Sequence, residues 1–275
     1  MGNAASATSG TASAATAAPP SAQLAIDQAG AVLSVGLNRP AKRNALNDGL
    51  MEDIQRCFAH LPDGVGAVVL HGVGDHFSAG LDLSELRERD ATEGLHHSQM
   101  WHRVFDRIQY CRVPVIAALK GAVIGGGLEL ACAAHIRVAE PSAYYALPEG
   151  SRGIFVGGGG SVRLPRLIGV ARMADMMLTG RVYSAAEGVV HGFSQYLTDD
   201  GGALDKAMEL ASRVADNAPL TNFAVLQALP LIAEANPQTG LLMESLMATV
   251  AQSDDEAKTR IRAFLDHRTA KVRPA

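Results

Sequence analysis

Apolar and polar residues alternate along the first part of this chain in short blocks. Apolar runs rich in β-branched residues predict strands over 31–37, 65–72, 113–119 and 136–139. Helical spacing predicts helices over 97–110, from an Asp48 cap to Ala59, and from the glycine run 125–127 to Ala134. Strands and helices that take turns in this way predict an α/β core.

Beyond about Gly169 the pattern is helical almost throughout. The periodicity predicts helices over 171–178, 185–191, 204–217, 220–233 and 239–265. We therefore expect an α/β core over residues 22–200 and a helical region over 201–275. Residues 1–21 are almost entirely Ala, Ser, Thr, Gly and Pro, which cannot assemble a packed core, so this segment is predicted to be a disordered tail.

Composition narrows the class of protein. The chain has 275 residues, 48% of them hydrophobic, and can bury a large core. A net charge of −4 without a dense basic block argues against nucleic-acid binding. The three cysteines are isolated, which argues against a disulfide framework or a zinc site and favours the reducing cytosol. No apolar run approaches the ~20 residues of a membrane span. We expect a soluble, cytoplasmic protein.

A glycine run opens the helix predicted after residue 124, and Glu129 lies just inside that helix. The first amides of a helix lack partners and, with the helix dipole, favour an anion, so the N–H of Gly126 is a candidate donor. Close packing of the helix against a sheet would explain the glycines about equally well. Glu129 has apolar neighbours and a position near the same helical face, which favours a carboxylate directed into the same pocket.

A second backbone donor is predicted at Leu81. An apolar strand leads into the turn at Gly80, where glycine permits a close approach of the backbone, and the Leu81 amide then needs no particular side chain. A tight turn without a ligand is the alternative. Asp82 and Glu85 have capping-box spacing, so we assign Asp82 a structural role.

Glu149, in Leu147-Pro148-Glu149-Gly150, is the second candidate acid. Taken alone, an acid between proline and glycine in a loop is more often a surface residue. Together with Glu129 and the backbone donors, it suits chemistry next to a carbonyl, where negative charge develops on an oxygen and a proton must be moved.

The ordered motifs of this chain resemble those of the crotonase (enoyl-CoA hydratase/isomerase) superfamily, over about Leu24 to Val272. They are Asn38-Arg39-Pro40, Asn44-Ala45-Leu46, Phe77-Ser78-Ala79-Gly80-x-Asp82-Leu83, Pro114-Val115-Ile116-Ala117-Ala118, Gly125-Gly126-Gly127-x-Glu129-Leu130, Leu147-Pro148-Glu149 and Leu178-Thr179-Gly180. The resemblance implies a spiral of β-β-α units and C-terminal helices that form a homotrimer, often a hexamer. It also implies an acyl-CoA thioester whose carbonyl lies between the amides of Leu81 and Gly126, and no metal or redox cofactor.

The resemblance also implies a reaction. Enoyl-CoA hydratases use two glutamates, which match Glu129 and Glu149, and this favours hydration of a 2-enoyl-CoA. Glu149 would be the principal proton carrier, and Glu129 would orient and activate the water. The alternatives are an enoyl-CoA isomerase, a hydratase-lyase acting on hydroxycinnamoyl-CoA, and a non-catalytic acyl-CoA or RNA-binding protein. The net charge and the two retained acids speak against the last of these.

Further positions are candidates for substrate contacts. The resemblance places Ala79 at the substrate. Three cations could meet the coenzyme A phosphates or simply form a solvated turn: Arg39, Lys42 and Arg43. Phe264 and Lys271 belong to a C-terminal segment that could reach a neighbouring subunit's coenzyme A. Where many relatives have a proline before the glycine-rich loop, this chain has Ile154-Phe155-Val156. Arg152 could serve a polar or acidic acyl group, or face solvent. The His96, His97 and His102 cluster lacks a partner at metal-ligand spacing.

Overall fold

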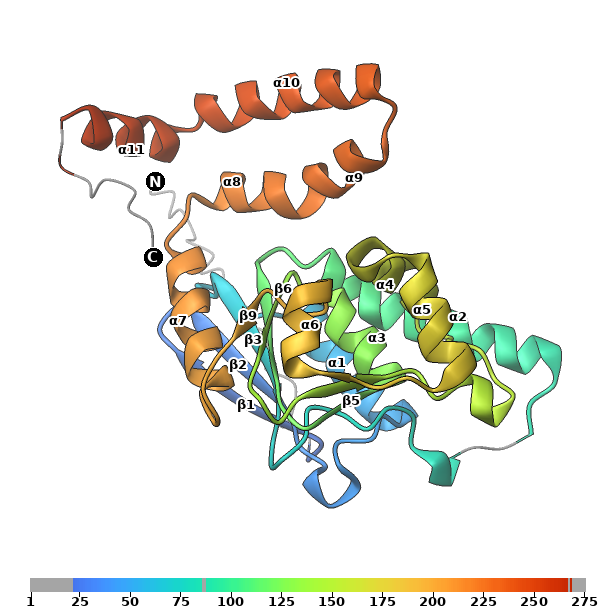
Figure 1. Ribbon diagram of the computed structural model, residues 1–275. Helices are drawn as coiled ribbons and strands as arrows, with labels where there is room; N and C mark the ends of the chain where they lie inside the picture. The colour runs from blue at the N-terminus through green and yellow to red at the C-terminus, as the bar shows by residue number, and fades with distance from the viewer. Residues whose placement is uncertain (1–21, 86–87, 267, 269–275) are drawn as a thin grey trace, which may run out of the picture.

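A six-stranded sheet forms the centre of the computed structural model, which describes residues 22–85, 88–266 and 268 (Figure 1). Its strands, in spatial order, are β1 (Leu24–Ala29), β2 (Val32–Leu37), β3 (Ala67–Gly72), β4 (Val115–Leu119), β6 (Ile136–Ala139) and β9 (Tyr196–Leu197). β1 and β2 are antiparallel, and every other neighbouring pair is parallel. The predicted tail over 1–21 lies outside the described residues.

A second, three-stranded sheet lies beside the first and consists of β5 (Ala122–Ile124), β7 (Tyr144–Ala146) and β8 (Tyr183–Ser184). From β4 to β7 the strands alternate between the two sheets: β4 then β5 lead into α3 (Gly126–Ala133), and β6 then β7 form the next turn. This arrangement confirms the predicted spiral of β-β-α units.

Helices cover these sheets and form the C-terminal part. They are α1 (Asp48–Ala59), α2 (Ala91–Gln109), α4 (Gly160–Ile168), α5 (Val170–Thr179), α6 (Ala185–His191), α7 (Ala203–Ala215), α8 (Pro219–Phe223), α9 (Leu229–Glu234), α10 (Pro237–Ser253) and α11 (Asp255–Leu265). Short 3-10 turns are η1 (Pro40–Lys42), η2 (Leu83–Glu85) and η3 (Gly150–Arg152), and η4 (Ala224–Ala228) is a π-helical turn. No helix among these described residues is long and apolar enough to cross a membrane.

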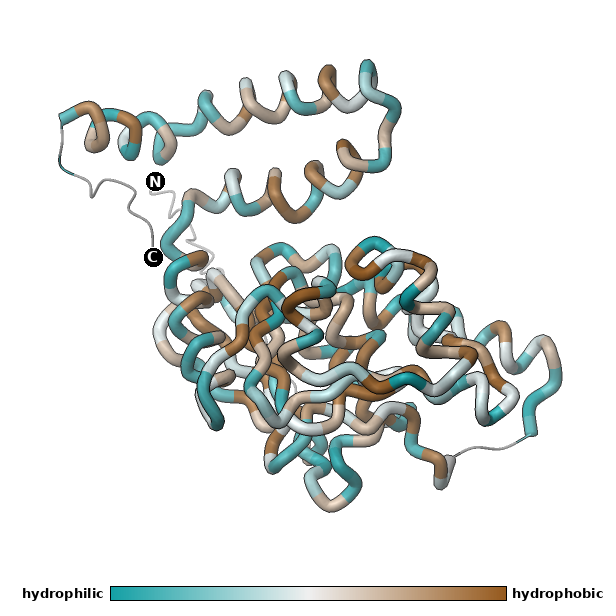
Figure 2. The backbone as a smooth tube through the Cα atoms, in the orientation of Figure 1, coloured by the Kyte–Doolittle hydropathy of each residue, from teal (hydrophilic) through white to brown (hydrophobic). Residues whose placement is uncertain are grey.

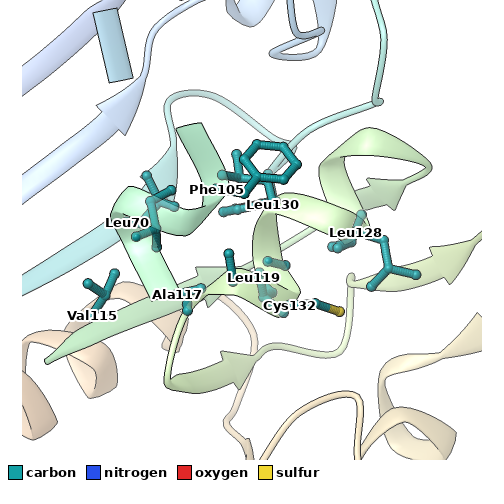
Figure 3. Close-up of a cluster of buried hydrophobic side chains, with 14 of the residues drawn as sticks. Leu70, Phe105, Val115, Ala117, Leu119, Leu128, Leu130 and Cys132 are labelled. Atoms are coloured by element: carbon teal, nitrogen blue, oxygen red, sulfur yellow. The ribbon is translucent and has the colours of Figure 1, made fainter. Parts of the chain in front are cut away.

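The inner strands β2, β3 and β4 of the larger sheet are buried on both faces because other elements cover the sheet on both sides there. Along β3, Val68 and Leu70 join the main core with α1, α2 and α3, whereas Val69 between them joins a smaller cluster with α7. Parallel strands buried on both faces need such continuous apolar runs. Figure 3 shows part of the main core, with these labelled side chains from β3, β4, α2 and α3: Leu70, Phe105, Val115, Ala117, Leu119, Leu128, Leu130 and Cys132.

Residues 219–266 form a C-terminal arm that extends beyond α7, with α10 and α11 in an outer layer away from the sheets (Figure 1). α9 contacts the core, where Glu234 pairs with Arg166 of α4 at 2.7 Å. Within the described chain, α10 buries only Gly240, and α11 buries no residue. Brown, apolar positions recur along this outer layer in Figure 2. Its exposed large apolar side chains are Leu241, Leu242, Leu246, Val250, Ile261, Phe264 and Leu265.

Several element boundaries differ from the predictions. Asn47, not Asp48, caps α1, since its side chain accepts the N–H of Leu50. α2 begins before the predicted residue 97, because Asp90 and Glu93 form a capping box. The single helix predicted over 239–265 is two helices, and Asp254 caps the second. β1, the short strands β5, β7, β8 and β9, and helix α4 were not predicted.

Candidate active site

The turn at Gly80 lies against the start of α3. The N–H of Ile124 donates to the carbonyl of Ser78 at 3.1 Å, so the segment before the turn runs alongside β5. Gly80 has φ +84°, and a Cβ on it would lie 2.6 Å from the Ile124 carbonyl oxygen and 3.3 Å from the Gly126 nitrogen. A glycine is required for this approach, which brings the backbone just before Leu81 against the amide of Gly126.

Leu81 and Gly126 both have a free backbone N–H: neither donates a hydrogen bond to any residue that the structure describes. On one side of the turn, Leu46 donates to the Gly80 carbonyl at 2.7 Å and accepts from Asp82 at 2.8 Å, so the Leu81 amide faces away from Leu46. Gly126 is the first residue of α3, where amides have no acceptor within the helix. The structure thus brings the two predicted donors together.

A buried polar network holds the Leu81 turn in place. Asp82 forms an ion pair with Arg39 at 2.8 Å, and Arg39 also donates to the carbonyl of Ala45. Hydrogen bonds from Ser84, followed by those from Arg39 and its charge, lower the pKa of Asp82 to about 2. The structural role predicted for Asp82 takes this form, while a capping-box bond with Glu85 lies outside what the structure describes.

Asn44 also stabilises this turn, through hydrogen bonds to the segment that precedes it. Its side chain is fully buried and donates to the carbonyls of Val73 at 2.9 Å and His76 at 2.7 Å. The Asn44 carbonyl accepts the hydroxyl of Ser78 at 2.8 Å, and the Ala79 N–H donates to Arg43 at 2.9 Å. Sequence reasoning did not assign Asn44 a role, although the motif that contains it was noted.

Glu129 is almost completely buried, as is all of helix α3. Its Oε1 accepts the N–H groups of Gly158 and Gly160, each at 2.8 Å. Burial raises the pKa of Glu129, while these amides and the charge of Arg163 offset part of that rise. Glu129 is therefore not a surface carboxylate, as its apolar neighbours in the sequence indicate.

Glu149 lies over the start of α3. A Cβ on Gly125 would lie 2.7 Å from Glu149 Oε1, and the buried Oε2 has no hydrogen-bond partner among the described residues. Burial raises the pKa of Glu149 to about 6, and the charge of Glu129 adds to the rise, so the two acids interact. The view that an acid in this loop is a surface residue is wrong, since Glu149 is only 7% exposed.

The glycine run also packs closely, as the alternative explanation of these glycines requires. A Cβ on Gly126 would lie 2.8 Å from the ring of Trp101, and one on Gly127 would lie 2.6 Å from the Ser78 carbonyl oxygen. Trp101, on α2, was not singled out from the sequence, yet it forms a wall beside the Gly126 amide. Its indole nitrogen is buried without a partner among the described residues.

The other predicted contact residues lie in three places. Lys42 and Arg43 are exposed near η1, whereas Arg39 is held by Asp82. Phe264 is 61% exposed on α11, which lies in the outer layer away from α3 (Figure 1), and Lys271 lies outside the described residues. Among the described residues, Phe264 therefore lies apart from Arg39, Lys42 and Arg43 within a single chain.

Two histidines of α2, His97 and His102, have partners other than a metal ion. His97 Nε2 lies 3.0 Å from Asp48 Oδ1, and His102 Nε2 lies 3.3 Å from the hydroxyl of Ser98. Among the residues described, no group of three His, Cys, Asp or Glu side chains could hold a metal ion. Arg152 is exposed, and its charge lowers the pKa of Glu149, which places it near that carboxyl.

Comparisons with known proteins show the family to which this chain belongs. The sequence matches the Enoyl-CoA hydratase/isomerase family over residues 27–273. A solved structure described as a putative enoyl-CoA hydratase from Rhodopseudomonas palustris CGA009 is 83% identical, with a TM-score of 0.89, and covers 94% of this chain and 100% of its own.

Two further relatives are each 34% identical to this chain. One is a probable enoyl-CoA hydratase of Bacillus subtilis (strain 168), with 89% of this chain and 95% of the relative covered. The other is the 2,3-dehydroadipyl-CoA hydratase of Escherichia coli (strain K12), with 90% and 97% covered. This chain belongs to the enoyl-CoA hydratase/isomerase family, the crotonase superfamily.

Proposed function

We propose that the protein is an enoyl-CoA hydratase that adds water across the double bond of a 2-enoyl-CoA thioester. The observation that carries the proposal is the pair of buried carboxylates, Glu129 and Glu149, near the amides of Leu81 and Gly126, which have no acceptor among the described residues. A family that includes hydratases and isomerases leaves the reaction open. Two acids, one to activate water and one to deliver a proton, favour hydration.

The amides of Leu81 and Gly126 would bind the thioester oxygen. As water adds to the β carbon, electrons move through the α carbon onto this oxygen, which becomes enolate-like. Two fixed donors stabilise that charge more than they stabilise the ground-state carbonyl, and the loss of one donor in a site of this type costs about 10²–10³ in kcat.

The two acids have different support, which suggests their roles. Glu129 receives two amide hydrogen bonds that favour its ionised form, so it would take a proton from the water. Glu149 has a buried oxygen without a donor, which disfavours its ionised form, so it would deliver its proton to the α carbon. The water oxygen bonds to the β carbon, and a proton passing between the acids restores the pair. The proton affinities belong to the coupled pair.

Further parts of the proposal concern the coenzyme and the assembly. Lys42 and Arg43 would meet the phosphates of coenzyme A, whereas Arg39 would hold the Leu81 turn. The exposed apolar side chains of the C-terminal arm would be covered in a homotrimer, or a hexamer made of two trimers, in which Phe264 and Lys271 approach a neighbour's coenzyme A. We propose no resident cofactor and a cytoplasmic location.

The test is hydration of a panel of 2-enoyl-CoA esters, followed by loss of the conjugated thioester absorbance. The panel includes crotonyl-CoA, a longer ester, an aromatic ester and one with a terminal carboxylate, because a relative is named for 2,3-dehydroadipyl-CoA and Arg152 lies near Glu149. Glu129→Gln and Glu149→Gln should each lower kcat by about 10²–10⁴, the range of acid–base catalysis.

Glu140→Gln is the matched control, because Glu140 is as buried as Glu149 but pairs with Ser142 and is not assigned to the site. It should hydrate at the unmodified rate. Product analysis separates the other reactions: a shifted alkene would indicate an isomerase, and a released aldehyde a hydratase-lyase. Acyl-CoA binding without turnover would contradict an enzyme of this kind.

A further inference from the structure

The position of Glu129 depends on a loop without side chains. Gly157–Gly160 supplies both amides that bind Glu129, and a run of glycines loses much conformational freedom when it is ordered. A Cβ on Gly158 would lie 2.6 Å from Phe105, and one on Gly160 would lie 2.7 Å from Glu129 Cγ. Only glycine allows the loop to approach Phe105 and Glu129 this closely. Because the glycines have no side chains to fix the loop, residues outside it must hold its amides against the carboxylate.

Arg163 holds the loop from the side of α4. Its side chain is 8% exposed, and Nη1 donates to the carbonyl of Gly158 at 2.9 Å. Nη2 donates to Asp106 at 2.6 Å and Nε to Gln109 at 2.5 Å, and these two acceptors lie three residues apart on one face of α2. One buried guanidinium therefore fastens the loop to two helices.

Ser98 holds the loop from the side of α2. Its hydroxyl donates to the carbonyl of Gly157 at 2.6 Å. That carbonyl belongs to the same planar peptide group as the N–H of Gly158, which donates to Glu129 at 2.8 Å. A hydrogen bond at one end of a peptide group fixes its plane and strengthens the donor at the other end.

We propose that Arg163 and Ser98 are positioning residues that act through the Gly157–Gly160 loop to hold Glu129 ionised and directed at the water. Neither side chain has to touch the substrate. The inference rests on the proposed role of Glu129 as the base and deepens it, because it names what fixes that base. The loop alone would leave the Glu129 carboxylate free to move, and small misplacements of reacting groups cost up to about 10²-fold in rate.

Electrostatics give the proposal a distinctive signature. Burial raises the pKa of Glu129, and the loop amides and the charge of Arg163 lower it. Loss of the loop amides' support, even in a variant that keeps a positive charge at position 163, leaves burial less opposed, so the pKa of Glu129 rises. Because Glu129 must be ionised to accept a proton, the acidic limb of the kcat profile should then move to higher pH. A merely structural defect would lower activity without moving this limb.

The experiment compares Arg163→Lys and Ser98→Ala with the controls Arg166→Lys and Ser212→Ala. Arg166 lies on the same helix and pairs with Glu234, and Ser212 is exposed on α7. On the best ester of the panel, Arg163→Lys should lower kcat about 10²-fold and Ser98→Ala about 5-fold, with KM changed less than about 2-fold. Both controls should match the unmodified enzyme.

A second readout does not depend on activity. Carbon-13 resonances of labelled glutamate carboxyls, with Glu129→Gln used for assignment, report where Glu129 titrates. Titration at higher pH in both variants supports the proposal, whereas unchanged titration and kcat overturn it. Should Arg163→Lys fail to fold, Ser98→Ala decides. An unmodified protein that hydrates no ester refutes the proposed function, and the titration still tests the positioning.

Discussion

The candidate site around α3 is tightly packed, whereas the C-terminal arm leaves large apolar side chains exposed to solvent. At the site, a methyl group on Gly80, Gly125 or Gly126 would lie 2.6, 2.7 or 2.8 Å from a neighbouring atom. On α10 of the arm, Leu241 and Leu246 are 63% and 59% exposed. Crowding shows where parts of the protein must approach each other closely, and exposure shows where apolar surface stays uncovered within one chain.

The sharpest way to break this comparison is to add a methyl group at the site. Gly80→Ala places a Cβ against the Ile124 carbonyl and moves the Leu81 amide, so kcat should fall about 10²–10³-fold. Steady-state hydration kinetics measure the change, and circular dichroism verifies the fold.

Gly64→Ala separates crowding from backbone strain. Gly64 has φ +81°, close to the +84° of Gly80, but a Cβ there meets no atom within 4 Å. Its kcat should stay close to that of the unmodified enzyme. An active Gly80→Ala variant, or equal losses in both, would show that crowding at the turn does not serve catalysis.

The arm supplies the next test. Leu246→Asp places a charge among the exposed apolar residues of α10, which the proposed trimer would bury, so analytical ultracentrifugation should show dissociation to a smaller species. Leu178→Asp on α5 is the control, because Leu178 is 86% exposed outside the arm, and it should keep the mass of the unmodified protein. An unmodified monomer, or an intact Leu246→Asp assembly, would contradict the arm's role.

The smallest predicted effect is on pH dependence. Burial, with the charge of Glu129, raises the pKa of Glu149 to about 6, and the charge of Arg152 opposes that rise. Because Glu149 would deliver a proton in the proposed reaction, kcat/KM should fall as pH rises through this pKa. Arg152→Gln removes the opposing charge, so the pKa rises and the alkaline limb moves to higher pH. The shift should be a fraction of a unit and weaken with salt, since Arg152 is exposed. A shift of the alkaline limb to lower pH in Arg152→Gln would contradict this electrostatic effect of Arg152 on Glu149.

Much of the fold could be predicted because its pattern is local. Parallel strands such as β4 are buried on both faces and consist of continuous apolar runs, which the sequence displays directly. β1 was missed because only Leu24 of its residues is buried, so it shows no apolar period. The two-residue strands β8 and β9 are too short to have a period.

The candidate site divides in the same way. Glu129 and Glu149 stand within short motifs that can be recognised in order along the chain. Arg163 and Ser98 were missed because they bind backbone carbonyls, and the carbonyl that Ser98 binds lies 59 residues further along the chain. Nothing in the type of a residue records which peptide group a hydroxyl will reach, so such partners come only from the folded structure.

The free donors at Leu81 and Gly126 belong to the backbone, and this changes which mutations the site can tolerate. The Leu81 side chain would not supply the proposed hydrogen bond to the thioester oxygen, so many codons at that position leave the backbone donor intact. Substitutions at neighbouring positions are more harmful. Gly80 is needed for the turn, and Gly127 is needed for the helix to pack against the Ser78 carbonyl. Leu81, whose amide is the proposed donor, can therefore be substituted more freely during evolution than Gly80 and Gly127, which place the backbone.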